Sequence, residues 1–471
     1  MPTLDIAAAP SSAANTPPAS RPATACARSG APGLVAVAEL RPGLHVELDL
    51  GWLDHPFPSN RFKLRDAEQI ATLVRLGLTQ VRVRADLSDA SALDALHAAR
   101  TEATDQGVAA PAPAVDMAVA DATRAGVAAS SAALRRQRLQ AQNRCLAQSD
   151  RLHGDSVRAW QALARETLVD PLRAGQAAAT VAGRLVDELG DDADTSVRVL
   201  HEAGGSSASQ HAINVTVLAL LLARHLGLDS ALQRVVAVGA LLHDIGKLAL
   251  PDPLRSAASD QSALALRARR DHVLHGVRLG SGMGLEPGAL RVIAQHHEQQ
   301  DGSGVPQGLS GTEIALPARI VALIDRYDRL CNPLGATVPR TPHEAQSVLY
   351  AQQRAQFDPE LLAAFVKLMG VYPPGSVVQL GDGRHALVVA VHPAHPLKPS
   401  VLVHEPSVPR EEALILHLHE QPGLGIRRSL SPQHLPRATL DYLSPRERLA
   451  YYYVHGLSGS QAASLDGDTP Q

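Results

Sequence analysis

The segment from Ala240 to Lys247 reads Ala-Leu-Leu-His-Asp-Ile-Gly-Lys, so three polar side chains interrupt an apolar run. Burying them without a function would be costly. If the segment is helical, Lys247 lies four residues after His243 and three after Asp244, which places the three side chains at neighbouring positions of one surface. An imidazole beside a carboxylate is a natural start for a transition-metal site, and the two carboxylate oxygens can bridge two ions. The segment therefore predicts part of a metal centre.

Further metal ligands must come from other segments, and the candidates lie between residues 211 and 325. They are His211 at the start of an apolar helix, His272, the pair His296-His297, and Asp325. A single histidine on an apolar face is more often a hydrogen-bonded core or surface residue, so none of these positions predicts a site alone. Their combination with His243 and Asp244 does predict a metal site.

The elements that must position these residues are helices. Turns marked by Gly and Pro divide residues 201–371 into successive helices, which form the main domain. Aromatic residues make up only 3% of the chain, so the core must be built from Ala, Val and Leu, a mixture that suits closely packed helices. We therefore expect a mainly α protein.

Smaller units flank this domain. The expected order is a disordered leader (1–32), a small α/β domain (33–88), a linker (89–131), a helical lead-in (132–200) and, after the main domain, a small β module (372–430) and a C-terminal tail (431–471). The α/β domain rests on a helical pattern over 66–76 and a strand pattern over 80–84, whereas the alanine-rich linker shows no consistent period. Asp382-Gly383 predicts a hairpin in the β module. Ser444, before a Pro and close to a Glu, is interpreted as the cap of a terminal helix.

Composition and charge exclude several classes of function. A formal net charge of -3 provides no strong field for a polyanion, so neither nucleic acid nor a membrane surface is an expected partner. The three cysteines, Cys26, Cys145 and Cys331, lie far apart and form no disulfide framework, which predicts a reducing cytoplasm. The most apolar run, Val215 to Ala223, is too short to span a bilayer.

The motifs resemble the HD-GYP domain in their order and spacing. The matching residues are His211, His243-Asp244 with Lys247, His272-Val273 with Gly276, His296-His297-Glu298, Asp301-Gly302-Ser303-Gly304-Val305-Pro306, and Asp325 with Tyr327-Asp328. Leu40-Arg41-Pro42-Gly43 and the segment 52–57 are similar to the small domain of unknown role that often precedes HD-GYP domains in bacteria. The resemblance implies an HD-superfamily helical bundle between the two smaller units.

The resemblance also implies an activity: hydrolysis of the bacterial messenger cyclic di-GMP to pGpG and/or GMP, by a two-metal centre with a bridging water as nucleophile. The implied metal ligands are His211, His243, Asp244, His272, His296, His297 and Asp325. Two divalent transition-metal ions, Fe or Mn first, would lower the pKa of the water and neutralise the charge that grows on the phosphate. Catalytic roles would fall to Asp244 and to Lys247, which would contact the phosphate. Asp301, Gly302, Gly304 and Arg340 would join Lys247 in substrate binding.

The chain departs from the HD-GYP pattern at three places. Val305 stands where the family has the tyrosine of its name, and valine can neither stack on the ligand nor hydrogen-bond to it. Cys331-Asn332-Pro333-Leu334 replaces an Arg-Pro-Tyr-Arg/Lys segment that helps to hold guanine and phosphate. Ser207 stands where three-metal members have a glutamate, which favours two ions.

These departures leave two alternatives to an active cyclic di-GMP phosphodiesterase. One is a catalytically weak or inactive binding and interaction module, and the other is a hydrolase of another nucleotide. Two substrate-binding candidates also have ordinary interpretations: Arg340 as a solvated residue before a helix cap, and Asp301 as the start of an Asx-turn.

The N-terminal domain carries no residues that suggest chemistry. It does carry four aromatic or imidazole side chains, Trp52, His55, Phe57 and Phe62. They could form a docking patch, although the core of the domain itself is the commoner use of such residues. A partner protein at this domain and a homodimer therefore stay open.

Overall fold

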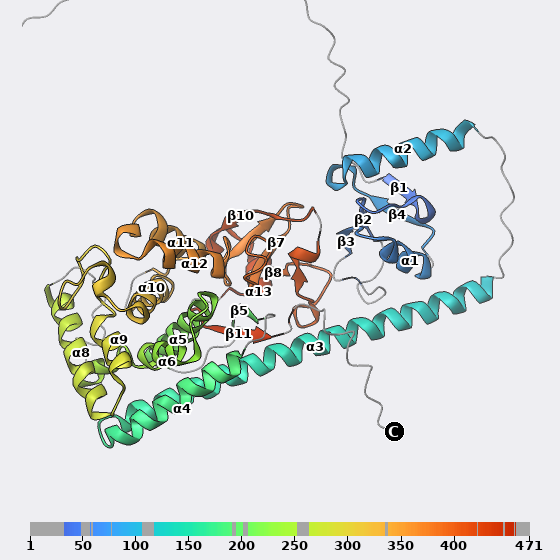
Figure 1. Cartoon of the computed structure of the whole chain (residues 1–471). Coiled ribbons are helices and arrows are strands. Elements are labelled where there is room, and N and C mark those ends of the chain that lie inside the picture. Colours follow the sequence, from blue (N-terminus) through green and yellow to red (C-terminus); the bar gives the residue numbers. More distant parts are fainter. Residues whose placement is uncertain are drawn as a thin grey trace, which may run out of the picture.

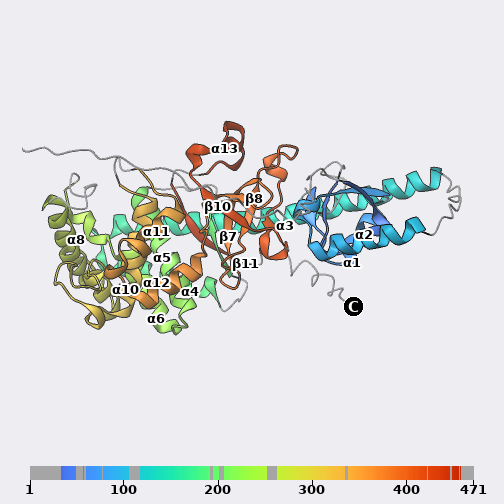
Figure 2. The ribbon, with the colours of Figure 1, turned by 90° about the horizontal axis from the view of Figure 1, so that it is seen from above.

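The computed structural model confirms a mainly α protein with a small N-terminal α/β domain and a small C-terminal β module. It describes residues 33–48, 57, 60–76, 78–105, 117–190, 195–200, 206–251, 263–334, 338–421, 423–445, 448–455 and 457. The leader predicted for residues 1–32, Cys26, Trp52 and His55 lie outside the described residues. Figures 1 and 2 show the N-terminal domain and the helical domain at opposite ends of the protein, with the β module between them and the long helix α3 (Met117–Glu166) running alongside.

The N-terminal domain is an antiparallel sheet with two helices. Its strand order is β1-β4-β2-β3, and its elements are β1 (Gly33–Ala36), β2 (His45–Glu47), β3 (Arg61–Lys63), α1 (Ala67–Arg75), β4 (Gln80–Val83) and α2 (Ala90–Asp105). The predicted helix is α1, which Asp66 caps, and the predicted strand is β4. Phe57 and Phe62 are buried with ring centroids 4.3 Å apart, so these two aromatic residues belong to the core of the domain.

The linker predicted for residues 89–131 is wrong, because this stretch contains α2 and the beginning of α3. Ala92, Leu93 and Leu96 of α2 are buried in the same cluster as side chains of the N-terminal sheet. Alanine has the highest helix propensity but provides little hydrophobic contrast, so a helix can form here without a visible period. The N-terminal domain therefore extends beyond its predicted end at residue 88.

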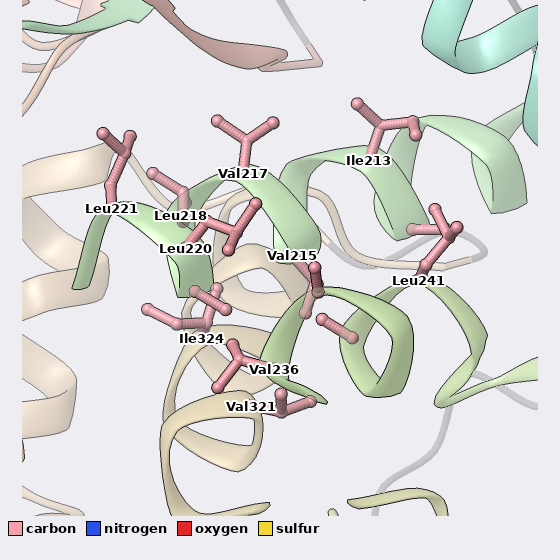
Figure 3. Packing of buried hydrophobic residues seen from close by; sticks show 14 of the residues in the cluster. Ile213, Val215, Val217, Leu218, Leu220, Leu221, Val236, Leu241, Val321 and Ile324 are labelled. Atoms are coloured by element: carbon pink, nitrogen blue, oxygen red, sulfur yellow. The ribbon is translucent and has the colours of Figure 1, made fainter. Parts of the chain in front are cut away.

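The helical domain surrounds α5 (Ser207–His225), which is buried over most of its length. The other helices are α4 (Pro171–Leu189), α6 (Ser230–Leu242), α8 (Ala263–Gly282), α9 (Pro287–Gln295), α10 (Leu316–Cys331), α11 (Pro342–Ala351) and α12 (Pro359–Met369). Figure 3 shows Val215 and Leu218 of α5 among side chains of α6 and α10, including Val236 and Ile324. A helix that is apolar on all sides belongs in the centre of a domain. Among the described residues, no helix combines the length and the apolar character that crossing a membrane requires.

The β module is completed by segments that lie far apart in the chain. Its antiparallel strands follow the order β10-β6-β7-β5-β11, and β8 pairs with both β7 and β9. The strands are β5 (Thr195–Val199), β6 (Val377–Leu380), β7 (His385–Val391), β8 (Ser400–Val403), β9 (Leu416–His417), β10 (Ile426–Leu430) and β11 (Tyr451–His455). The predicted hairpin joins β6 to β7, and Gly383 in its turn has a φ of 91°. Glycine adopts this conformation without a steric cost.

The C-terminal tail predicted for residues 431–471 is wrong in its described part. β11 pairs with β5, so this segment and the predicted helical lead-in (132–200) each supply a strand to one sheet. Ser444 also has a different role from the predicted one, because it follows the end of α13 (Arg437–Leu443) and does not cap the start of a helix. Its φ of 43° and ψ of 58° are left-handed, the conformation with which many helices end.

Candidate metal centre

Five segments of the helical domain bring all seven predicted metal ligands to one place. His211 lies on α5, His243 and Asp244 directly follow α6, His272 lies on α8, His296 and His297 directly follow α9, and Asp325 lies on α10. The residues form two clusters that share Asp244: the Asp325 cluster (His211, His243, Asp244, Asp325) and the His272 cluster (Asp244, His272, His296, His297). Within each cluster, one candidate ligand atom per residue lies within 4.8 Å of the others. Each cluster could therefore hold a metal ion.

The distances between the nitrogen and oxygen atoms suit a common ion. In the Asp325 cluster, His211 Nε2 lies 3.2 Å from His243 Nε2 and 3.0 Å from Asp325 Oδ1. In the His272 cluster, the Nε2 atoms of His272 and His296 are 3.2 Å apart. Atoms that bind one ion at about 2.1 Å are separated by about 3 to 3.5 Å. The spacing of the side chains thus agrees with metal coordination.

Asp244 offers one oxygen to each cluster. Its Oδ2 lies 3.6 Å from His211 Nε2 and 3.5 Å from His243 Nε2, whereas its Oδ1 lies 3.4 Å from His272 Nε2 and 3.9 Å from His296 Nε2. Oδ1 is buried and receives no hydrogen bond from the described residues. A buried carboxylate oxygen without a donor is costly unless a cation stabilises it. The residues of the site therefore fit a bridging role for Asp244 between two ions.

Hydrogen bonds at the opposite ring nitrogen orient His243 and His296. Nδ1 of His243 donates to Ala240 O at 2.6 Å, and Nδ1 of His296 donates to Ile293 O at 2.8 Å. Because a carbonyl oxygen only accepts, Nδ1 carries the proton and Nε2 presents its lone pair to the clusters. Burial, followed by the nearby His243, lowers the pKa of His296 to about 4. This ring is therefore neutral at physiological pH, as a metal ligand must be.

The His-Asp pair lies just beyond a helix end, so the α-helical spacing considered for Lys247 does not apply. α6 ends before the pair, and Ile245–Ala249 form the 3-10 turn η3. Lys247 on this turn still reaches Asp244, with Nζ 2.6 Å from Oδ2. A Cβ atom on Gly246 would lie 1.9 Å from His272 O, so glycine lets the turn pack directly against α8. This close packing brings Asp244 to the histidine of α8.

Two carboxylates carry charge at the centre of the site: Asp325 is buried, and the side chain of Asp244 is 14% exposed. Burial alone would raise the pKa of Asp244, but Lys247, an adjacent histidine and Arg329 outweigh it and hold the pKa well below its usual value. Burial likewise opposes ionisation of Asp325, whose pKa is held low by Arg329 and His211. Both groups are therefore ionised at neutral pH, and positive charge must stabilise them.

Sequence reasoning missed Arg329, which contacts both carboxylates. Its Nη2 donates to Asp244 Oδ2 at 2.6 Å, and its Nε lies 2.8 Å from Asp325 Oδ1. Arg329 follows Asp325 by four residues on α10, a spacing at which oppositely charged side chains meet on a helix, so this contact had a signal in the sequence. The contact with Asp244 depends on the packing of α10 against α6 and had none.

A buried network behind His211 was also missed. Asp328 Oδ2 lies 2.6 Å from His211 Nδ1. The other oxygen, Oδ1, accepts from the side-chain amides of Asn214 at 2.7 Å and Asn332 at 2.9 Å, and both amides also donate to Leu449 O. Such outer partners fix the orientation of a metal-binding histidine and raise its basicity.

The loop from Asp301 to Ser310 lies beside the His272 cluster. The buried carboxylate of Glu298 accepts from two backbone N–H groups of this loop, at 2.7 and 3.0 Å, and holds it in place. The N–H of Val305 donates to His297 O at 3.0 Å. The position at which the HD-GYP pattern has tyrosine is therefore adjacent to the cluster.

The contacts of the predicted substrate-binding residues fit their ordinary interpretations. Asp301 is exposed, and its Oδ1 accepts from the N–H two residues further on at 3.0 Å, which forms an Asx-turn. Arg340 is exposed just before the N-cap of α11. Gly302 has a φ of 78°, and a Cβ atom on Gly304 would lie 2.3 Å from a backbone nitrogen, so the loop itself requires both glycines. Substrate binding by these four residues stays a prediction.

Comparison with known families agrees with this geometry. The HD domain family matches residues 198–361, the span that contains both clusters. The chain carries an HD domain. A domain of unknown function (DUF3391) matches residues 34–180 and precedes the HD domain. Both parts of the predicted resemblance are thereby confirmed.

Several curated proteins similar to this chain are named after cyclic di-GMP. A cyclic di-GMP phosphodiesterase of Pseudomonas aeruginosa is 35% identical over 194 residues, which cover 41% of this chain and 47% of the relative. The cyclic di-GMP phosphodiesterase response regulator RpfG of Xanthomonas campestris pv. campestris is 35% identical over 167 residues, 35% of this chain and 43% of the relative. A 3'3'-cGAMP-specific phosphodiesterase of Vibrio cholerae is 31% identical over 163 residues, 34% of this chain and 31% of the relative. The chain spans less than half of the length of each of these relatives.

Proposed function

We propose that this protein is a metal-dependent cyclic dinucleotide phosphodiesterase that hydrolyses cyclic di-GMP to pGpG and/or GMP. The observation that carries the proposal is the pair of His/Asp clusters that share Asp244, located in an HD domain and beside Lys247. Relatives named as cyclic di-GMP phosphodiesterases support the substrate class.

The residues of the two clusters would hold two divalent ions, and Asp244 would contribute one oxygen to each. When bound, such ions lower the pKa of a water that attacks the phosphate, and they neutralise the charge that develops in the displacement. Mixed imidazole and carboxylate ligands suit Fe and Mn. Nδ1–H of His243 and of His296, fixed on backbone carbonyls, would keep both rings turned toward the ions.

Lys247 would bind a non-bridging oxygen of the phosphate. Its ammonium lies 2.6 Å from Asp244 Oδ2, and its side chain is 24% exposed, so it borders the clusters and still reaches solvent. A fixed positive charge beside the reacting phosphate stabilises the transition state. Asp301, Gly302, Gly304 and Arg340 would contribute further contacts to the substrate, as the HD-GYP resemblance implies.

The proposal is tested with the full chain, stripped of metal and reloaded with Mn²⁺ or Fe²⁺ under reducing conditions. The loaded protein should convert cyclic di-GMP to pGpG or GMP. The double variant His243→Ala with Asp244→Ala should lose this conversion, because Asp244 belongs to both clusters. The matched control His434→Ala with Asp441→Ala changes exposed residues and should retain it. Full activity of the first variant would contradict the proposed mechanism.

Two alternatives rest on particular observations. Val305 lies next to His297 and offers no aromatic ring to a base, which favours a module that binds the nucleotide without turnover. Calorimetry that shows binding, joined to the absence of product with several metals, would support this alternative.

The similarity to a 3'3'-cGAMP-specific phosphodiesterase favours a hydrolase of another nucleotide. Competition between cyclic di-GMP and 3'3'-cGAMP at equal concentrations in one assay decides between the two substrates.

A further inference from the structure

Arg329 contacts the same carboxylate oxygens that would bind an ion in the Asp325 cluster. The guanidinium lies 2.6 Å from Asp244 Oδ2 and 2.8 Å from Asp325 Oδ1. These two oxygens in turn lie 3.5 and 3.6 Å from His243 Nε2. The positive charge of Arg329 and a metal ion would therefore compete for the same ligand atoms.

The His272 cluster is arranged differently. Its carboxylate oxygen is Asp244 Oδ1. This oxygen and Asp325 Oδ1 are both buried without a hydrogen bond from a described residue, but it is Asp325 Oδ1 that forms an ion pair with Arg329. Lys247 and Arg329 both donate to the other oxygen, Oδ2. The same carboxylate thus has one oxygen held by two cations of the protein and one turned toward histidine nitrogens.

The charges at the site mean that the contacts of Arg329 affect where an ion can bind. Asp244 and Asp325 are two negative groups, and they are contacted by two positive ones, Lys247 and Arg329. An ion added to the Asp325 cluster while Arg329 stays in place would bring like charges within a few ångströms of each other in a buried site, where repulsion is poorly screened. The side chain of Arg329 is 17% exposed, so it has a route toward solvent.

We infer that Arg329 is a built-in competitor of the metal ion at the Asp325 cluster. The first ion binds at the His272 cluster, and a second ion binds at the Asp325 cluster only when the guanidinium leaves the two carboxylates. The inference rests on the metal-binding part of the proposed function. It makes the metal supply a determinant of whether the protein holds one ion or two.

The test measures metal binding alone. The full chain is stripped with a chelator and titrated with Mn²⁺ by calorimetry, and the ratio of metal to protein is measured by mass spectrometry after gel filtration. The wild-type protein should show one tight and one weak step. Arg329→Met removes the charge but keeps the length of the side chain. It should tighten the weak step by about tenfold or more, because the ion no longer has to break the contacts of Arg329 with the two carboxylates before it binds. Arg329→Lys, which keeps the charge, should leave the second step weak.

A matched control lies one turn away on the same helix. Arg326 donates to Gln353 Oε1, outside both clusters, so Arg326→Met should show the wild-type steps. Two further variants assign the steps without changing Arg329. His297→Ala should remove the tight step, whereas Asp325→Asn should leave it in place.

Three results would overturn the inference. They are two equally tight steps in the wild-type protein, an unchanged weak step in Arg329→Met, or loss of the tight step in Asp325→Asn with its retention in His297→Ala. The last result does not depend on the folding of an Arg329 variant. Since no nucleotide is present, a chain that fails to hydrolyse cyclic di-GMP can still pass this test, and one that hydrolyses it can still fail.

Discussion

Two groups of histidines in this protein have similar ring spacing but different surroundings. In the candidate metal centre, neighbouring imidazole centroids are 4.1 to 5.4 Å apart. The β-module histidines (His392, His395, His417 and His419) have neighbouring centroids 4.5 to 5.9 Å apart. Ring proximity alone therefore does not separate the two groups.

The difference lies in where the ring nitrogens point and in what anchors them. In the HD domain, the rings of His243 and His296 are buried, tied to backbone carbonyls, and turned toward a shared carboxylate. In the β module, the rings of His395 and His419 stack with an interplanar angle of 3°, which leaves their nitrogens side by side rather than converging. The two groups thus differ in whether the ring nitrogens converge on a carboxylate. Hydrogen bonds at the opposite ring nitrogen hold the rings of His243 and His296 in the convergent orientation.

The largest effect on this comparison is expected from Asp244→Asn, because Asp244 is the residue that both clusters share. Its metal affinity should fall by at least about 1,000-fold, which exceeds the ~10 to 100-fold loss that removal of one outer partner causes. Equilibrium dialysis followed by metal analysis measures the change. Asp441→Asn, an exposed substitution on α13, should keep the wild-type metal content. Retention of both ions by Asp244→Asn would show that the shared carboxylate is not what distinguishes the HD-domain histidines.

His153 is buried far from both histidine groups in the chain, and it tests what burial alone does to a histidine. Its effect is measured through the pH dependence of the stability of the protein. His153 on α3 is 1% exposed, and burial, with Arg198 as the second cause, lowers its pKa to about 4 from 6.5. The folded state therefore resists protonation of His153, so the associated stability is complete above pH 6.5 and is lost as the pH falls toward 4. The loss amounts to about 3 kcal/mol at most.

Urea unfolding of His153→Phe between pH 4 and 7 measures this contribution. The variant keeps an aromatic ring but has no titrating group, so its stability should fall less over this range than that of the wild-type protein. His434→Gln, at an exposed position, should retain the wild-type pH dependence. Parallel curves for His153→Phe and the wild-type protein would mean that burial does not hold this histidine neutral.

Asp328→Asn tests the outer hydrogen bonds directly. The amide carries no negative charge, so the charge-assisted contact with His211 Nδ1 is weakened and the ring is oriented less firmly. Metal affinity at the Asp325 cluster should fall by about 10 to 100-fold, as competition with a chelator would measure. An unchanged affinity would mean that the contact between Asp328 and His211 does not contribute to the difference between the two histidine groups.

The smallest effect is expected from His395→Ala combined with His419→Ala. These rings stack near the surface of the β module, so the unfolding free energy should change by less than about 1 kcal/mol and the metal content should stay the same. Thermal unfolding and metal analysis of the same sample measure both. A lower metal content would mean that the β-module histidines bind metal as well, and the contrast between the two groups would disappear.

The sequence by itself determined the ligand types, their order and several local elements. Residue identity and short-range spacing are enough to place a carboxylate next to a histidine, to start α1 at its Asp66 cap, and to turn the β6–β7 hairpin at Gly383. All seven predicted ligands also lie in the two clusters, because their combination was informative where each one alone was not.

Tertiary structure decided what the sequence could not. The alanine-rich stretch has too little alternation of apolar and polar residues to predict α2. The pairing of β11 with β5 joins two strands that lie far apart in the chain, which local patterns cannot predict. The same holds for Arg329: its spacing from Asp325 is ordinary on a helix, and only the packing of α10 against the end of α6 brings its guanidinium to Asp244. Which cation each carboxylate oxygen meets is set by contacts between distant segments, because charge acts through space and not along the chain.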